Sequence, residues 1–491
     1  MKTASQAGKI AVNSPVHGYF CMRHLQGKPR SQTSLLPPSI EEYIPENHPV
    51  RVIDAFVESL DVIEMGFDKA RTAATGRRPY HPGDLLKLYI YAYLNQTSST
   101  RRLEKECHRN LEVLWLMKQL APDFKTIADF RKDNGQAIKR VCRQFVLFCK
   151  QAGLVSGQLV AIDGSKFKAA ASKDQALTRK QLEKQVGKLE QKIDHYLGQL
   201  DASDQQKDTD LNQAKVHDAL AYLQSHKAEL QDELKALVDN DDTQTCRTEP
   251  EARLMKSGRE GMVVGYNAQN AVDAEHQLVV HHELTQVGGD NRQLEPMAKA
   301  SQAVLEDELD TIVADAGYSN GEQLEDIRKA GVNVAVPSNR SVNNQGTGDF
   351  FQKSDFTYLP DADAYRCPAG QLLHYKTRNT QQRIHLYART GCSQCPLQGQ
   401  CTTADRRWVT RHFHEEALEQ AQWQATSERM VRRMATVEPT FATLKRLLNK
   451  GRLTCWGLAS AASEYSLGVL CYNLMRVINI LGVKGALARL C

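Results

Sequence analysis

The sequence has little that would direct it into a membrane or out of the cell. Its first residues, MKTASQAGKIAVNSP, contain no apolar core of the kind that a secretory signal has. The most apolar late stretch, 465–490, is interrupted by Asn473, Arg476, Asn479 and Lys484. We therefore expect no membrane-spanning helix there, and secreted and membrane classes of protein are disfavoured.

The chain also has little net charge of either sign. The formal net charge is only +5 over 491 residues, which by itself names no partner. Charged residues make up 25% of the chain and hydrophobic residues 41%. This balance is that of an ordinary globular protein and excludes a disordered chain, and the length leaves room for several domains.

The cysteines do not form a disulfide framework. Eight of the twelve are scattered through apolar or helical patterns, where a free cysteine behaves as a small buried side chain. We therefore expect a reducing compartment, the cytoplasm. The other four lie in one region of the chain and are Cys367, Cys392, Cys395 and Cys401.

The spacing of these four cysteines favours a metal site. Cys392 and Cys395 form a Cys-x₂-Cys pair, and four thiolates close a tetrahedral structural zinc site. We expect Zn²⁺ here, with His374 or His385 as lower-ranked substitutes for one ligand. The alternative is four reduced thiols without a metal.

The first 150 residues read as helical. Apolar residues at near-helical spacing, and a capping position at Thr126, predict helices in 83–95, 97–117 and 126–150. Between 101 and 150, twelve Lys or Arg face six Asp or Glu, a local net charge of +6. This is either a solvated helical surface or a surface that meets DNA phosphates.

A helical hairpin interrupts the middle of the chain. Apolar residues recur three or four apart in 182–200 and again in 216–237, with the polar stretch 201–210 between them. This pattern predicts an antiparallel helical hairpin. A spacer or packing arm is the main interpretation of its role, and dimerisation or DNA contact are the alternatives.

Strand signals surround this hairpin. The run QLVAIDG predicts a strand that ends at Asp163, 261–286 predicts two further strands, and TIVA predicts a strand followed by Asp315. Helices are expected between and after them, one capped by Asp290 and one capped at Ser319. The order predicts an α/β fold with a mixed sheet.

Two carboxylates fall at strand ends in this pattern. If the strands of Asp163 and Asp315 are neighbours, the acids lie a few ångströms apart and suit a hard divalent cation such as Mg²⁺. Glu438 is the candidate for a third acid. Pro439 predicts a helix start or kink there, and Lys445 lies two turns further on. Turn residues and a solvated glutamate are the alternatives.

Four blocks of the chain resemble a known family. AIDGSKFKA, GYNAQNAVD, VADAGYSNGEQL and VEPTFATLKR resemble, in that order, the core blocks of bacterial insertion-sequence transposases of the DDE superfamily. The resemblance implies a ribonuclease-H-like catalytic fold. It also implies that Asp163, Asp315 and Glu438 bind Mg²⁺ or Mn²⁺ and catalyse phosphoryl transfer by two metals.

The resemblance extends to DNA contacts. The helical region around DLLKLYIYAYLN and TIADFRKDN resembles the family's N-terminal domain. Basic side chains near the acids are expected to contact DNA, and these are Lys166, Arg433, Lys445 and Arg446. The block SERMVRRM lacks a tyrosine that related sequences often carry, and TEPEARLMKSG is assigned no catalytic role.

These observations predict a domain organisation and a function. A helical DNA-binding domain is expected over 1–150 and a catalytic domain over 151–491, with the hairpin inserted near 174–245 and the cysteines near 345–425. We expect a transposase that acts on terminal inverted repeats and target DNA, as a homodimer in the cytoplasm of a bacterium, associated with the nucleoid. A nuclease without joining activity and a catalytically inactive DNA-binding regulator are the alternatives.

Overall fold

The computed structural model describes residues 39–71, 78–204, 210–258, 260–306, 308–338 and 350–490. Cys21, Cys491 and most of the leader of the predicted N-terminal domain lie outside the described residues, as do 205–209 in the predicted polar turn. Residues 44–491 form one compact unit. The α/β class predicted from the sequence, with a helical N-terminal region and insertions, is confirmed.

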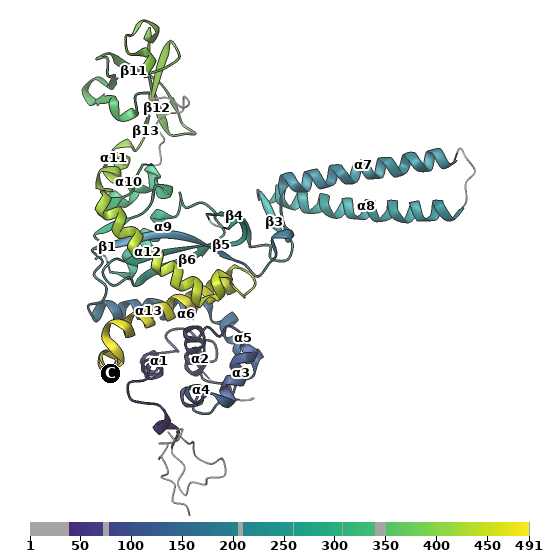
Figure 1. Ribbon diagram of the computed structural model, residues 1–491, viewed down its shortest axis with the longest axis vertical. Helices are drawn as coiled ribbons and strands as arrows, with labels where there is room; N and C mark the ends of the chain where they lie inside the picture. The colour runs from purple at the N-terminus through teal and green to yellow at the C-terminus, as the bar shows by residue number, and fades with distance from the viewer. Residues whose placement is uncertain are drawn as a thin grey trace, which may run out of the picture. The chain divides into compact units, whose positions relative to one another are not determined.

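The helical region begins this unit, and its first long helices start at prolines. Proline suits the first helical turn because its missing N–H has no partner there in any case. His48 and His81 cap these helices by accepting hydrogen bonds from Val50 N and Gly83 N. The helices of this region are α1 (Pro49–Glu58), α2 (Pro82–Leu94), α3 (Thr100–Arg109), α4 (Leu111–Leu116), α5 (Phe124–Asp133) and α6 (Gly135–Gln151) (Figure 1).

A six-stranded mixed sheet forms the centre of the unit. Its order is β4-β5-β1-β7-β8, with β6 also paired to β5. β1 pairs antiparallel with β5 and parallel with β7, and β8 continues the parallel part. The arrangement agrees with the ribonuclease-H-like sheet that the resemblance implies. The strands are β1 (Leu159–Lys168), β4 (Arg253–Ser257), β5 (Gly261–Asp273), β6 (Val279–Thr285), β7 (Thr311–Val313) and β8 (Asn333–Ala335).

Strand β1 is longer than the sequence predicts. It runs to Lys168, because its antiparallel partner β5 continues beside it after the parallel pairing with β7 has ended at Ala161. Gly265 permits the close approach of these two strands. A Cβ atom at this position would lie 1.9 Å from the carbonyl oxygen of Phe167, which no side chain can tolerate.

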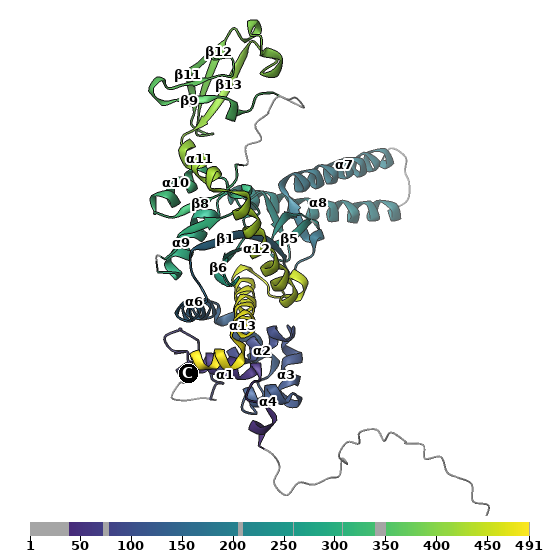
Figure 2. The ribbon, with the colours of Figure 1, turned by 60° about the vertical axis from the view of Figure 1, so that its left-hand side comes forward.

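The helices that pack on this sheet join it to the N-terminal region. They are α9 (Leu294–Val304), α10 (Gly321–Lys329), α11 (Glu415–Gln424), α12 (Ser427–Leu447) and α13 (Leu458–Leu490). Helix α13 contacts α1, α2 and α6 as well as β6 and α12 (Figure 2). Buried side chains of the sheet and of the N-terminal helices therefore belong to one continuous hydrophobic core.

Helix α13 explains the apolar late stretch of the sequence. Within the described part of the chain it is the one helix that is long and apolar enough, by length and composition, to cross a membrane. Over half of its apolar window is buried inside the protein. Tyr465, Leu467 and Leu474, for example, have no exposed surface, which is typical of a core helix.

Helix α12 contradicts the prediction of a start or kink at Pro439. It is a continuous helix from Ser427 to Leu447 with Pro439 inside it. A proline at this position leaves the carbonyl group four residues earlier, that of Ala435, without its helical donor. The side chain of Gln277 supplies the missing hydrogen bond, because its Nε2 lies 3.1 Å from Ala435 O.

Three predicted helix caps are also wrong. The caps are Asp123 for α5, Gln293 for α9 and Asn320 for α10, instead of Thr126, Asp290 and Ser319. Asn320 Oδ1 accepts hydrogen bonds from Glu322 N and Gln323 N. Asparagine caps a helix in this way as well as serine does. The side chain of Asp290 is engaged elsewhere, as described below.

The predicted helical hairpin is present. It consists of α7 (Arg179–Asp204) and α8 (Asp210–Asp239), which lie side by side (Figures 1 and 2). The short antiparallel strands β2 (Ala176–Thr178) and β3 (Gln244–Cys246) close its base. Leu182, Val186, Leu230 and Leu237 form a separate small core between the two helices.

A second sheet carries the cysteine-rich region. Its order is β13-β12-β11-β10-β9, and all its pairs are antiparallel. Its buried core is small, and consists of Phe356, Tyr365, Leu373, Tyr387 and Val409. The strands are β9 (Thr357–Leu359), β10 (Ala364–Arg366), β11 (Leu372–Asn379), β12 (Ile384–Thr390) and β13 (Arg406–His412).

Candidate active site

The register of two parallel strands places Asp163 beside Asp315. The last paired residues of β1 and β7 are Ala161 and Val313. Each acid lies two residues beyond its strand's last pair, so the two carboxylates reach the same edge of the sheet at the same height. The sequence could predict the two strands but not the full length of β1 and not that these strands are neighbours.

Arg433 lies between the two acids. Its Nη2 atom is 3.0 Å from Asp163 Oδ2 and 3.5 Å from Asp315 Oδ2. Helix α12 contacts β1, β5 and β7, and its buried positions include Val437 and Thr440, one and two turns beyond Arg433. The arginine is thus directed onto the sheet, and its side chain is only 11% exposed. It was expected to contact DNA, but here it contacts the acids.

The environment of Asp163 disfavours an isolated negative charge. Burial raises the pKa of this carboxyl group to about 6, and the charges of Asp315 and Asp290 act in the same direction. The Arg433 guanidinium and a 2.8 Å hydrogen bond from Gly164 N oppose this rise in pKa. A cation between the two carboxylates therefore stabilises the ionised pair, and Arg433 supplies that charge in this structure.

The structure does not bring Glu438 into this group. Glu438 lies on α12 five residues after Arg433, which is about 140° around a regular helix, and it is exposed. Among the described residues no set of three or more His, Cys, Asp or Glu side chains is placed to hold a metal ion. The expected convergence of three carboxylates is therefore seen for two of them.

Lys445 and Glu438 share one flank of α12, as their spacing predicts. The Nζ atom of Lys445 lies 5.7 Å from the centre of the Phe167 ring, which belongs to β1. This flank therefore runs along β1 beyond Asp163. Arg446 is exposed on the same helix, so it is accessible to a polyanion.

Lys166 has a different position from the one expected. Side chains alternate along a strand, and Lys166 faces the side of the sheet opposite to Asp163. Its Nζ atom lies 3.5 Å from Asp290 Oδ1, and its side chain is 11% exposed. Lys166 is therefore part of a buried polar group and not of an open basic surface.

The two glutamates of the TEPEARLMKSG block stabilise the fold. Glu249 is 2% exposed and accepts hydrogen bonds from Ala171 N, the Tyr266 hydroxyl and Gly457 N. Glu251 accepts from Leu458 N at the start of α13. These contacts join β5 and the end of β1 to α13, and neither carboxylate contacts the acid pair.

The basic excess in 101–150 divides into two parts. The basic side chains of α6 are used inside the unit: Lys139 pairs with Glu283 at 3.0 Å and Lys150 with Glu306 at 3.0 Å. On α3 the basic side chains are exposed, and these are Arg101, Arg102, Lys105 and Arg109. Exposed basic side chains of this kind suit contact with a phosphate backbone, and Lys125 and Lys132 of α5 are exposed as well.

The four clustered cysteines line one cavity at an end of the second sheet. This cavity, of about 360 Å³, is bounded by Cys367, Cys392, Cys395 and Cys401 together with apolar residues of the surrounding loops. Burial raises the pKa of Cys401, and the other three thiols add to this rise. The ten cysteines of the described residues are all free.

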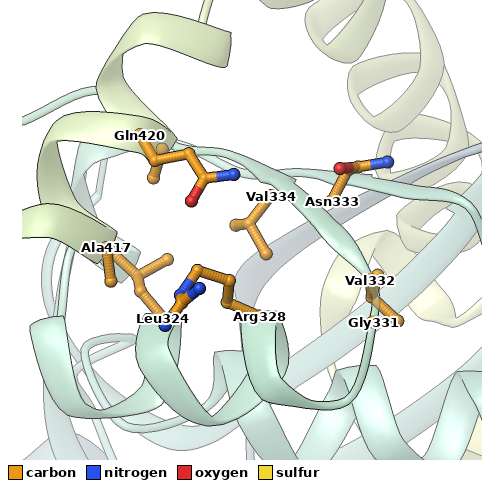
Figure 3. A pocket seen from close by; sticks show the side chains of 9 residues that line it. Leu324, Arg328, Gly331, Val332, Asn333, Val334, Ala417 and Gln420 are labelled. Atoms are coloured by element: carbon orange, nitrogen blue, oxygen red, sulfur yellow. The ribbon is translucent and has the colours of Figure 1, made fainter.

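A small cavity away from the acid pair is lined mostly by apolar residues. It has a volume of about 160 Å³ and lies between α10, β8 and α11 (Figure 3). Its lining includes Leu324, Val332, Val334 and Ala417, with Arg328 as the charged member. None of the residues that line it belongs to the acid pair.

Two segments of the chain match families of transposase domains. Residues 38–133 match a transposase domain (DUF772), and residues 366–478 match a transposase DDE domain. The resemblance to DDE transposases is confirmed. The first match covers α1 to α5, and the second covers the four cysteines, Glu438 and Lys445.

Other comparisons add little. No curated protein matches the chain. A solved structure, the cryo-EM structure of a piggyBac transposase synaptic complex with hairpin DNA, is similar over 90% of this chain and 78% of that chain, at 9% identity and a TM-score of 0.30. A likeness this weak carries no argument.

Proposed function

We propose that this chain is a DNA transposase that cleaves the ends of an insertion sequence and joins them to target DNA. The observation that carries the proposal is the pair formed by Asp163 and Asp315, aligned by strand register and sharing one cationic nitrogen at 3.0 and 3.5 Å. The two transposase-domain matches support the same class of protein.

The acid pair fits a hard divalent cation. One oxygen of each carboxylate already lies within 3.5 Å of the Arg433 guanidinium, so the two point toward a shared positive charge. Carboxylate oxygens are the ligands that Mg²⁺ and Mn²⁺ prefer. We assign Asp163 and Asp315 as ligands. Glu438, which the resemblance implies as the third ligand, lies outside the acid pair in this structure. When bound, such ions activate an attacking water or 3′-hydroxyl group and stabilise the leaving oxygen of the phosphate.

The surrounding basic residues bind and orient the DNA. In this structure Arg433 pairs with the two acids, and the resemblance implies that its guanidinium would also contact a phosphate of bound DNA. Lys445 and Arg446 extend the basic flank of α12, and the exposed face of α3 offers a second contact. We assign the helical region, 1–150, as the DNA-binding domain. The catalytic domain is assigned to 151–491, with insertions near 174–245 and 345–425.

The partners follow from the same proposal. Terminal inverted repeats and target DNA are the substrates, and pairing of two ends calls for a homodimer in the synaptic complex. A cytoplasmic location, associated with the nucleoid, is consistent with the free cysteines. The resemblance implies the DNA substrates and the homodimer, and the cysteine usage favours the cytoplasm.

A strand-transfer assay tests the proposed function. Purified wild type, incubated with duplexes that carry the inverted repeats flanking its gene and with Mg²⁺, should cut and join them. Asp315→Asn should reduce both products below detection while binding of the duplex persists, because only the metal ligand is lost. Asp310→Asn is the matched control, since Asp310 is an exposed carboxylate five residues earlier.

Each other outcome of this assay selects an alternative. Cutting without joining identifies a nuclease of the same fold. Binding without cutting, in Mg²⁺ and in Mn²⁺, identifies a DNA-binding regulator. Wild-type cutting by Asp315→Asn contradicts the assignment of the acid pair.

We also propose that Cys367, Cys392, Cys395 and Cys401 hold a structural Zn²⁺, although in this structure the four thiols are not yet arranged as a closed metal site. Two observations support this: the four thiols border one cavity, and the sheet beside them has only five buried hydrophobic residues in its core. A core of this size rarely stabilises a separate sheet, and small units of this kind commonly need a metal or disulfide. The described cysteines form no disulfide.

A further inference from the structure

A group of polar side chains is buried behind the acid pair. Gly164 and Lys166 face the side of β1 opposite to Asp163, and their partners on β5 are Gln269 and Asn267. Both amide side chains have no exposed surface. Polar side chains this deeply buried require hydrogen-bond partners, so their partners reveal what the group holds together.

Asp290 is the centre of this group. Its Oδ1 atom accepts hydrogen bonds from Asn267 Nδ2 at 2.8 Å and from Gln269 Nε2 at 2.7 Å. Lys166 Nζ lies 3.5 Å from the same oxygen and balances its charge. Asn267 Nδ2 also donates to Val287 O at 3.0 Å, which fixes the loop that carries Asp290.

The group touches the backbone of the catalytic strand. A Cβ atom at Gly164, the residue next to Asp163, would lie 2.3 Å from Gln269 Nε2 and 2.7 Å from Asp290 Oδ1. The absence of a side chain at Gly164 therefore lets these two groups pack directly against β1. Any displacement of Asp290 or Gln269 is transmitted to the peptide unit that carries Asp163.

Tyr318 connects the group to the second acid. It lies three residues after Asp315, has no exposed surface, and donates a hydrogen bond from its hydroxyl to Gln269 Oε1. Burial raises the pKa of Tyr318 well above its usual value, so the hydroxyl keeps its proton and remains a donor. Gln269 thus contacts the segment of one acid through Tyr318, and it lies directly against Gly164 on the strand of the other acid, where Asp290 holds its amide.

We propose that Asp290 and Tyr318 are positioning residues that set the separation of Asp163 and Asp315 through Gln269. The inference rests on the proposed function, in which the acid pair holds a divalent cation. Neither residue contacts the pair directly. They act through a path of hydrogen bonds and packing that links the Asp315 segment to the Asp163 strand behind the sheet.

Binding of Mn²⁺ to the full chain in the absence of DNA tests this inference. Tyr318→Phe removes only the hydroxyl that donates to Gln269, and we expect about a tenfold loss of Mn²⁺ affinity, the usual scale for a lost contact behind a metal ligand. Tyr365→Phe is the matched control, because Tyr365 is a buried tyrosine of the second sheet, 2% exposed. It should bind Mn²⁺ like wild type.

Two variants of Asp290 separate positioning from general damage. Asp290→Asn keeps an oxygen acceptor for the amides of Asn267 and Gln269 and should retain most of the Mn²⁺ affinity. Asp290→Ala removes the acceptor and should lose at least as much affinity as Tyr318→Phe. Thermal unfolding of each variant is measured in parallel, and the loss of affinity should exceed what any shift in unfolding temperature explains.

The outcomes are distinct from those of the transposition assay. Wild-type Mn²⁺ affinity in both Tyr318→Phe and Asp290→Ala overturns the inference, and so does a wild-type chain that binds no Mn²⁺. Mn²⁺ binding that follows the expected order, in a chain that neither cuts nor joins DNA, leaves the positioning role standing and overturns the proposed function.

Discussion

At the scale of single residues, charge compensation governs the site. Arg433 satisfies two carboxylates with one nitrogen, and its own Nε is buried without a hydrogen-bond partner. A buried guanidinium with an unused donor is costly, so its contacts with Asp163 and Asp315 carry its stabilisation in this structure.

Two neighbouring histidines with little exposed surface give a prediction at the same scale. Burial lowers the pKa of His281 to about 4, and it lowers the pKa of His282 well below its usual value. Glu283 opposes the shift of His281, whereas Lys139 adds to it. Because the folded pKa is below the unfolded value, these residues are neutral in the native state, and their stabilisation is lost as the pH falls below about 6.5.

The expected loss is measurable by chemical denaturation. Between pH 7 and pH 5, His281 alone should contribute about 2 kcal/mol to the decrease in the free energy of unfolding. His281→Gln cannot titrate and should show a correspondingly shallower decrease. An identical pH dependence in wild type and His281→Gln would show that this histidine is not buried in its neutral form.

At the scale of elements, helix α12 shows what a local sequence pattern misses. Pro439 predicts a break, but the helix continues because Gln277, distant in sequence, donates to the freed carbonyl of Ala435. The same helix hides the role of Arg433, since the sequence does not state which side of α12 meets the sheet. By contrast, the apolar spacing of the hairpin was sufficient, because its partners are local in sequence.

The second sheet provides a prediction about metal content. If its cysteines hold zinc, the purified full chain should contain one equivalent of Zn²⁺, and its four clustered thiols should be protected from alkylation until a chelator is added. Cys392→Ser should lose the zinc, whereas Cys471→Ser, at a buried cysteine of α13, should retain it. Absence of stoichiometric zinc, with four freely reactive thiols, contradicts this proposal.

At the scale of the whole molecule, contacts between distant segments decide what the sequence could reveal. The two strands that carry Asp163 and Asp315 were predictable, because short apolar runs and turn residues are local signals, but the extension of β1 to Lys168 was not, since it depends on the pairing with β5. The position of Lys166 and the role of Asp290 were not, since both depend on the pairing of β1 with β5. A signal was present in Asn267 and Gln269, which are polar at alternate positions of β5, although Asn270 and Asp273 also interrupt the apolar pattern of this strand.

The largest difference concerns the third acid. Family resemblance assigns Glu438, but its exposed position on α12 does not bring it to the pair. Sequence order alone cannot fix the rotation of a helix against a sheet to within one residue. Asp163 and Asp315 are the two acids that the structure brings together, so the most direct test is made on these two residues.

The central claim is that Asp163 and Asp315 bind the metal that drives DNA strand transfer. The most direct measurement is strand transfer by Asp163→Cys and Asp315→Cys in Mg²⁺ and in Mn²⁺, because a thiolate is a poor ligand for Mg²⁺ and a better one for Mn²⁺. We predict no product in Mg²⁺ and recovered product in Mn²⁺ for both variants. Equal strand transfer in the two metals would contradict the claim, since it would mean that neither side chain coordinates the ion.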